Sequence, residues 1–293
     1  MKCLKTNRFN IGEIVIGFEA DWKIKVGEEF IHFCVEDNPD YRVVFRQVEE
    51  LECCRKEPVQ KLMGIDIFLD GYGGFVRQFK EEGKGARPYA IQHCDWKHKI
   101  ITVEYINEGQ KNLNHTNGAF FHSAWEDIML REQRMIVHAC CVETPLGGIL
   151  FSGRSGIGKS TQGELWCRYE GAKVINGDRP ILRKDEVSGE WMAYGSPYAG
   201  SSRYHINANV SVRAIAILEQ AKECTIRRLS VAEAFQKLYA QLTISTWNSV
   251  CVEVACNLLE NLVTEIPVYE FACTPDYEAV KTLKNTIGQE VAE

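Results

Sequence analysis

The sequence contains no apolar run that approaches the roughly 20 residues of a membrane-spanning helix. It also has no internal repeat and no low-complexity segment, and this excludes collagen-like and low-complexity architectures. The N-terminal segment lacks the apolar core of a signal peptide, because Asn7, Asn10 and Glu13 interrupt it. We therefore expect a cytoplasmic protein without a signal peptide and without a membrane partner.

An excess of basic residues is also missing. The chain of 293 residues has 34 Lys and Arg against 40 Asp and Glu, a formal net charge of −6. A general nucleic-acid-binding protein normally carries a basic surface, so we expect no nucleic-acid partner. Apolar residues make up 45% and charged residues 25% of the chain, which is typical of a globular protein of one large or two medium domains.

None of the twelve cysteines forms the C-x-x-C pair of many zinc sites. The adjacent pairs Cys53–Cys54 and Cys140–Cys141 cannot each turn both side chains toward one site from a strand, because successive strand side chains point to opposite faces. We therefore expect no zinc site. Without a secretion signal, we expect reduced thiols, several of them serving as small core residues.

The first third of the chain has the alternation and the β-branched and aromatic content of short strands. It predicts a largely antiparallel sheet that ends near Asn107, with the segments 23–27 and 29–36 among its strands. The apolar period then becomes that of one amphipathic helix over residues 117–134. We therefore predict a β-rich recognition or docking domain over residues 1–111 and a second domain over residues 112–293.

Strands and helices are mixed in the second domain, which predicts an α/β fold that is α+β for the whole chain. Apolar strands are expected at 135–143 and 147–153, and a helix at 158–171. A short strand at 172–177, a β-hairpin at 179–195 and a Gly/Ser-rich loop follow. Ser230 and Glu233 form a capping-box pattern that predicts the start of a later helix.

A phosphate-binding motif carries the chemistry of this domain. Residues 153–160 match G-x-x-x-x-G-K-[ST] at every fixed position, between an apolar strand and a predicted helix. Glycines let successive backbone N–H groups point inward, and the helix N-terminus adds positive charge. Lys159 reaches the β- and γ-phosphates, and the Ser160 hydroxyl can coordinate Mg²⁺. The residues expected to bind the nucleotide are Gly153, Arg154, Ser155, Gly156, Ile157, Gly158, Lys159, Ser160 and Thr161.

Two further residues are candidates for the chemistry. Asp178 follows the next predicted strand, which returns the chain to the side of the phosphate-binding loop. It can serve as a metal ligand, together with Ser160, or as the base that accepts a hydroxyl proton. His138 lies on the strand before the loop, where an imidazole can bind phosphate or the incoming hydroxyl.

The segments that carry these residues resemble the HPr kinase/phosphorylase family and its relatives with a PEP-carboxykinase-like fold. They are His138-Ala139, the stretch 148–161 and the sequence INGDR at 175–179, and the resemblance extends over residues 135–218. It implies a P-loop kinase core that uses ATP and Mg²⁺. It also implies γ-phosphoryl transfer to a hydroxyl, of Ser or Thr in a peptide or protein, or of a small alcohol.

Within the resemblance, Lys159 corresponds to the phosphate-binding lysine and Ser160 to the metal-binding hydroxyl. His138 corresponds to the family histidine, and Asp178 with Arg179 to the end of an Asp-Asp-Arg motif. The first Asp of that motif is Gly177 here, so either Asp178 serves both metal and proton transfer or His138 is the base. The N-terminal third does not resemble that of true HPr kinases, so HPr is not the expected substrate.

The loop 195–203 combines Gly195 and Gly200 with hydroxyl groups, Tyr198 and Arg203. We predict that it closes over the phosphates as a lid, with the two glycines as hinges. Arg203 is then expected to contact the γ-phosphoryl group as a catalytic cation, with Arg154 and Arg179 as the other candidates. Two different functions stay open, a non-catalytic nucleotide-binding regulator of a biosynthetic pathway and a PEP-carboxykinase-like metabolic enzyme.

Overall fold

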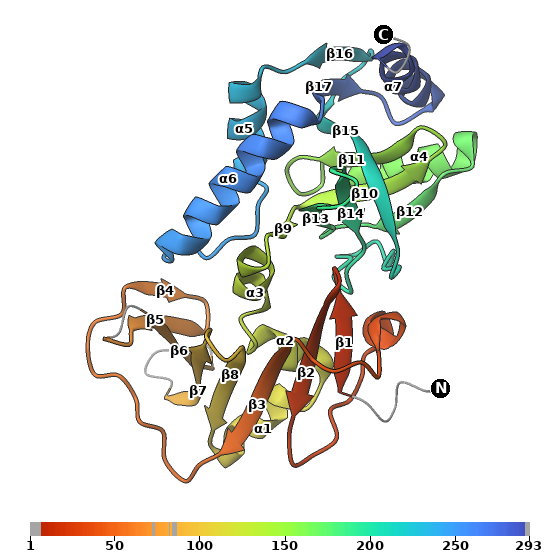
Figure 1. The fold of residues 1–293 in the computed structure, drawn as a ribbon. Coiled ribbons are helices and arrows are strands. Elements are labelled where there is room, and N and C mark those ends of the chain that lie inside the picture. Colours follow the sequence, from red (N-terminus) through yellow and green to blue (C-terminus); the bar gives the residue numbers. More distant parts are fainter. Residues whose placement is uncertain (1–6, 72–73, 82, 84–86, 291–293) are drawn as a thin grey trace. The chain divides into compact units, whose positions relative to one another are not determined.

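The computed structural model describes residues 7–71, 74–81, 83 and 87–290, and it divides the chain into two compact units. Unit 1 is Met1–Trp125 and unit 2 is Glu126–Glu293 (Figure 1). Each unit has its own mixed β-sheet, so the chain is a mixed α/β protein consistent with an α+β fold. The division falls after the predicted boundary at residue 112, and the docking role of the N-terminal region stays a prediction.

Within the described residues, unit 1 has an eight-stranded sheet. Its strands are β1 (Arg8–Ile11), β2 (Ile14–Glu19), β3 (Tyr41–Gln47), β4 (Gln60–Leu62), β5 (Ile65–Leu69), β6 (Phe75–Lys80), β7 (Pro88–Asp95) and β8 (Ile100–Tyr105). They lie in the order β1-β2-β3-β8-β7-β6-β5-β4. The predicted antiparallel pairing is confirmed for most neighbours and is wrong for β2–β3 and β3–β8, which are parallel.

Two predicted strands of unit 1 are not strands. Residues 23–27 form only an isolated bridge from Lys25 to His115. The segment Glu28–Phe33 is a 3₁₀ helix, η2, in which Phe30 and Phe33 are buried. Side chains three residues apart share one face of a 3₁₀ helix, so this conformation buries both rings at once.

The predicted helix at 117–134 is also wrong as one element. It is preceded by η3 (Asn107–Gly109) and α1 (Gln110–Leu113) and splits into α2 (Thr116–Phe121) and α3 (Trp125–Arg131). Ala124 has φ +52° between them, which interrupts the helical hydrogen bonds. Phe120 of α2 is buried against the rings of Phe9, Phe18 and Phe30. This aromatic cluster makes α2 part of unit 1.

Unit 2 contains the predicted strand–loop–helix. Its strands are β9 (Met135–Ile136), β10 (Ala139–Thr144), β11 (Gly147–Ser152), β12 (Lys173–Asn176), β13 (Ile181–Lys184), β14 (Trp191–Tyr194), β15 (Asn209–Gln220), β16 (Thr225–Arg228) and β17 (Val268–Cys273). They lie in the order β12-β10-β11-β15-β14-β13-β9, and β17 pairs with both β15 and β16. The helices are α4 (Lys159–Glu170), α5 (Val231–Tyr239), α6 (Ser249–Glu265) and α7 (Tyr277–Glu290).

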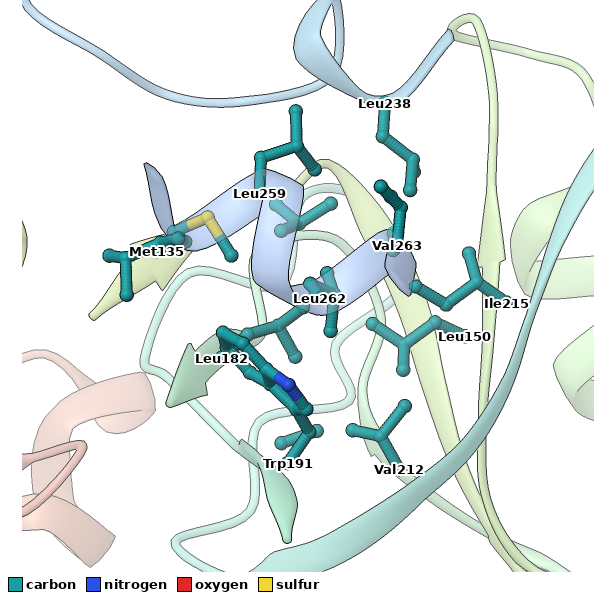
Figure 2. Packing of buried hydrophobic residues seen from close by; sticks show 14 of the residues in the cluster. Met135, Leu150, Leu182, Trp191, Val212, Ile215, Leu238, Leu259, Leu262 and Val263 are labelled. Carbon is teal, nitrogen blue, oxygen red and sulfur yellow. The ribbon is translucent and has the colours of Figure 1, made fainter. Parts of the chain in front are cut away.

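Helices cover both faces of the unit 2 sheet. One apolar cluster joins Leu150 and Ile215 to Leu259 and Leu262 of α6 (Figure 2). A second cluster joins Phe151 to residues of α4 and α7, including Trp166. Neighbouring residues of β11 belong to different clusters because strand side chains alternate between faces. The sheet is therefore buried on both sides, and ligand access is left at its edges and strand ends.

Of the described cysteines, ten are free, and several of these are buried as the sequence predicts. Cys34 is disulfide-bonded, so the prediction of reduced thiols is wrong at this position. Cys3 lies outside the described residues. No helix in the described part of the chain is long and apolar enough to cross a membrane.

The buried imidazole of His122 makes unit 1 sensitive to acid. Its Nδ1 lies 2.7 Å from the Gly118 carbonyl oxygen, and its Nε2 lies 3.0 Å from the Tyr89 hydroxyl. Burial lowers the pKa of His122 from 6.5 to about 4. The unfolded chain then binds more protons than the folded chain between these two values, so stability is lost as the pH falls from about 6.5 to about 4.

We expect this one group to lower the free energy of unfolding by roughly 3 kcal/mol across that window. Denaturant unfolding of wild type and His122→Gln at pH 7 and at pH 4 isolates the contribution. The variant is expected to lose roughly 3 kcal/mol less than wild type between the two pH values. Equal losses in the two proteins would show that the buried imidazole is not the acid-sensitive group.

Candidate phosphate-binding site

Three chain segments meet at one edge of the unit 2 sheet. Because β10 pairs antiparallel with both β11 and β12, the carboxyl ends of β11 and β12 lie beside the beginning of β10. The phosphate-binding loop follows β11, Asp178 follows β12, and His138 directly precedes β10. Two hydrogen bonds join these segments, Ala139 N–H to the Asp178 carbonyl at 3.0 Å and Ser152 Oγ to the His138 carbonyl at 2.9 Å.

His138 occupies a break in the edge rather than the middle of a strand. The sequence predicts one strand over 135–143, whereas the structure has β9 and β10 with Val137 and His138 between them. At the break the backbone changes partners, since Val137 N–H donates to Pro180 and His138 N–H donates to Gln241. This break gives the imidazole its place next to the carboxylate of Asp178.

The loop between β11 and α4 has the conformation of an anion cradle. Gly153, Gly156 and Gly158 have φ values of +139°, +76° and +114°, which other residues rarely adopt. Gly158 is the N-cap of α4 and provides no side-chain cap. Among the described residues, no acceptor bonds the backbone N–H of Gly156, Gly158 or Lys159. These donors and the positive end of α4 are therefore available to an anion.

The Lys159 ammonium lies inside this loop. Its side chain is buried, and Nζ donates to the carbonyl oxygens of Gly153 at 3.1 Å and Arg154 at 3.3 Å. Burial lowers the pKa of Lys159, the carboxylate of Asp178 opposes this shift, and Arg179 adds to it. In the described part of the chain, this ammonium is hydrogen-bonded to two carbonyl oxygens and paired with no carboxylate, so it is suited to a polyanionic ligand.

Asp178 is the centre of the charged cluster. Its Oδ1 lies 3.2 Å from His138 Nε2, and its Oδ2 accepts from Arg179 Nε at 3.3 Å. Burial, and next the Lys159 charge, lower the pKa of His138, while Asp178 raises it. The net shift of the His138 pKa is downward, which favours the neutral imidazole at pH 7.

The Ser202 side chain occupies the space that a side chain at position 177 would need. A Cβ on Gly177 would lie 1.6 Å from Ser202 Oγ and 2.6 Å from Ser202 Cβ. The turn that holds Ser202 also contacts Asp178, because a Cβ on Gly200 would lie 3.0 Å from Asp178 Cγ. The packing of Ser202 therefore leaves no room for a side chain at position 177. Asp178 is the carboxylate at this turn.

Backbone contacts hold the start of the loop 195–203. Gly195 N–H donates to Ala208, and a Cβ on Gly195 would lie 1.8 Å from the Ile206 carbonyl oxygen. Ile206 N–H in turn donates to Ile175 of β12 at 3.0 Å. Gly195 is thus required by close backbone packing, and its role as a lid hinge stays a prediction.

The structure brings together part of the predicted site. Lys159, Asp178 and His138 form one electrostatic cluster with Arg179. Ser160 is half-buried in the first turn of α4. Five other predicted residues are exposed, namely Arg154, Ser155, Gly156, Thr161 and Arg203. Arg203 has φ +61°, and no hydrogen bond or ion pair in the described part of the chain joins its side chain to this cluster.

The sequence interpretation missed Asn176. Its side chain is fully buried, donates to the Tyr198 carbonyl oxygen and accepts from the Arg179 N–H. The available signal was an Asn at a strand end, two residues before Asp178, where Asn commonly organises a turn. Among the described residues, no group of three or more His, Cys, Asp and Glu could hold a metal ion by itself.

Comparison with known proteins does not assign this chain to a family. No protein-family model matches the chain, and no curated protein matches its sequence. Among solved structures, the chain is similar to the Hpr(Ser) kinase/phosphatase from Coxiella burnetii. The two are 12% identical, the match covers 54% of this chain and 90% of that chain, and the TM-score is 0.32. A similarity of this size carries no argument about function.

The close contact at Gly177 predicts a measurable coupling with Ser202. Gly177→Ala is expected to destabilise the protein by about 1–3 kcal/mol, because the added methyl group overlaps the Ser202 side chain. In a Ser202→Gly background the same substitution is expected to cost much less. Denaturant unfolding of the two single variants and the double variant measures this coupling.

Gly288→Ala is the matched control, because a Cβ there meets no atom within 4 Å. It is expected to leave stability unchanged or slightly raised, as for Ala in a helix. A cost at Gly177 that is the same with and without the Ser202 side chain would contradict the packing account.

Proposed function

We propose that this protein is an ATP- and Mg²⁺-dependent kinase that transfers the γ-phosphoryl group to a hydroxyl. The hydroxyl belongs to Ser or Thr of a peptide or protein, or to a small alcohol. The observation that carries the proposal is the cluster of Lys159, Asp178 and His138 beside a loop in which the backbone N–H groups of Gly156, Gly158 and Lys159 have no acceptor among the described residues. Nucleotide phosphates fit such donors, and a neighbouring carboxylate and imidazole fit a hydroxyl that must lose a proton.

The residues present also fit Mg²⁺. The metal prefers hard oxygen ligands and is usually bound by one or two protein groups together with phosphate oxygens. The Ser160 hydroxyl and the Asp178 carboxylate are such groups, and both belong to segments at the same sheet edge. When bound, Mg²⁺ neutralises negative charge on the phosphates.

The chain's own groups then have separate tasks. The loop N–H groups and Lys159 bind and orient the phosphates, and Arg179 orients Asp178 through the contact between Nε and Oδ2. As the acceptor oxygen bonds to phosphorus and the bond to the leaving ADP oxygen breaks, the hydroxyl proton passes to a base. That base is Asp178, or His138 through its neutral imidazole, because Gly177 leaves no second carboxylate.

A non-catalytic nucleotide-binding regulator is the second candidate function. The observation that favours it is the close packing of Ser202 against Gly177, which leaves Asp178 without a second carboxylate at this turn. Both functions require nucleotide binding, and only the kinase requires turnover. Incubation with Mg²⁺ and γ-labelled ATP, with and without a panel of serine peptides and small alcohols, separates them. Labelled acceptor supports the kinase, and intact ATP bound without turnover supports the regulator.

Lys159→Ala is expected to remove most of the affinity for ATP, because it removes the cation that neutralises the phosphates. Isothermal titration calorimetry with Mg²⁺ and ATP measures the change, and we expect a loss of at least about tenfold. Lys173→Ala is the control, because Lys173 is an exposed lysine at the start of β12. ATP affinity within twofold of wild type in Lys159→Ala would rule out this loop as the phosphate site.

Asp178→Asn is expected to retain ATP binding and to lower turnover by roughly 10²-fold or more, the scale of losses at a general base or metal-positioning group. The substitution keeps the shape of the side chain and removes its charge. Asp185→Asn, in the turn between β13 and β14, is the control for removal of one carboxylate from unit 2. Unchanged turnover in Asp178→Asn would eliminate Asp178 as base and leave His138.

A further inference from the structure

We propose that Asn176 is a positioning residue that sets the direction of the Asp178 carboxylate and joins it to the segment 196–198. Its catalytic importance rests on the proposed function, whereas its geometry does not. Asn176 is the last residue of β12 and is 0% exposed. A fully buried amide must satisfy its donors and its acceptor within the protein.

The carbonyl end of the Asn176 side chain holds the turn that carries Asp178. Oδ1 accepts from the backbone N–H of Asp178 at 3.0 Å and from that of Arg179 at 2.7 Å. These two residues also form the ion pair of the site. One oxygen atom therefore fixes the backbone of both charged residues, and this limits the directions in which their side chains leave the turn.

The amino end of the same side chain holds the segment 196–198. Nδ2 donates to the carbonyl oxygen of Ser196 at 2.9 Å and to that of Tyr198 at 3.2 Å, and lies 3.3 Å from Ser196 Oγ. Ser196 Oγ donates to the Arg179 carbonyl oxygen at 2.7 Å. The hydrogen bonds form a closed ring. Asn176 bonds Ser196, Ser196 bonds Arg179, and Arg179 bonds Asn176.

This arrangement requires an amide. Asn combines an acceptor with two donors on one short side chain, whereas an ionised Asp has only acceptors and Ala has neither. With Ala at position 176, the N–H groups of Asp178 and Arg179 and the carbonyl groups of Ser196 and Tyr198 lose this partner. Buried polar groups without a partner cost free energy, and this cost falls if the turn of Asp178 or the segment 196–198 moves so that they find other partners. Movement of the turn displaces Asp178 from His138 and from the phosphate-binding loop.

A purely structural role for Asn176 is the competing explanation, and Asn248 provides the matched control. Asn248 is also buried, and its Oδ1 accepts from the backbone N–H of Val250 at the start of α6. Asn248→Ala therefore removes a buried amide from unit 2 without touching the turn of Asp178. A general loss of stability affects both variants, and a positioning role affects only Asn176→Ala.

The first arm of the test is hydrogen exchange in the full chain without nucleotide. In Asn176→Ala we expect the amides of Asp178 and Arg179 to exchange at least about tenfold faster than in wild type, and to be unchanged in Asn248→Ala. If Asn176→Ala does not fold, Asn176→Asp replaces it. That variant keeps Oδ1, so these two amides should stay protected. It loses the donor to Ser196 Oγ, which accepts from the Tyr198 N–H at 3.2 Å, so the amide of Tyr198 should exchange about tenfold faster. Wild-type exchange at all three amides would overturn the proposal.

The second arm is steady-state turnover of ATP with Mg²⁺. We expect kcat of Asn176→Ala to fall at least about tenfold with KM within twofold, because the phosphate-binding loop is unchanged while Asp178 is displaced. Asn248→Ala should retain wild-type kcat. An equal fall in the two variants would overturn the positioning role. Wild type without turnover would instead refute the proposed kinase, and the exchange arm would still decide the role of Asn176.

Discussion

The antiparallel direction of β10 between β11 and β12 is the constraint on which the rest of the site depends. It makes β11 and β12 run the same way, so the phosphate-binding loop and Asp178 leave the sheet at one edge. It also makes β10 begin where its neighbours end, and this places His138 at the same edge. With helices packed on both faces of the sheet, this edge is where charged groups can remain accessible to a ligand.

The electrostatics of this edge favour an anion. Lys159 and Arg179 are cations, His138 is neutral, and Asp178 is the carboxylate between them. Burial lowers the pKa of both Lys159 and His138, so positive charge at this edge is costly without a counter-ion. Phosphate groups would supply the negative charge that the protein lacks here. The close packing of Ser202 against Gly177 keeps the balance positive, because a second carboxylate would neutralise it.

The sequence predicts the local features of this protein well. The glycine loop lies between a strand and a helix as its motif requires, and Ser230 and Glu233 form the predicted capping box. The predicted hairpin is present as β13 and β14. Each of these depends on residues close together in the chain, where turn and cap preferences act directly.

The errors and omissions depend on contacts between distant residues. The segment Glu28–Phe33 forms a 3₁₀ helix in which Phe30 packs on Phe9 and Phe120 of other elements, whereas the sequence pattern alone favours a strand. The sequence does not show that the Ile206 backbone lies against Gly195, where it leaves no room for a Cβ. Asn176 bonds Ser196 and Gly177 packs against Ser202. The sequence does not show that the segment 196–202 lies next to the end of β12.

The central claim is that this sheet edge binds nucleotide phosphates against Asp178 and His138. A crystal structure of the full chain with Mg²⁺ and a non-hydrolysable ATP analogue tests it most directly. The account predicts phosphate oxygens on the N–H groups of the 153–160 loop, the metal on Ser160 and Asp178, and the γ-phosphate beside His138. An analogue bound at another place, or phosphates on the loop with Asp178 and His138 out of reach of them, would contradict the account.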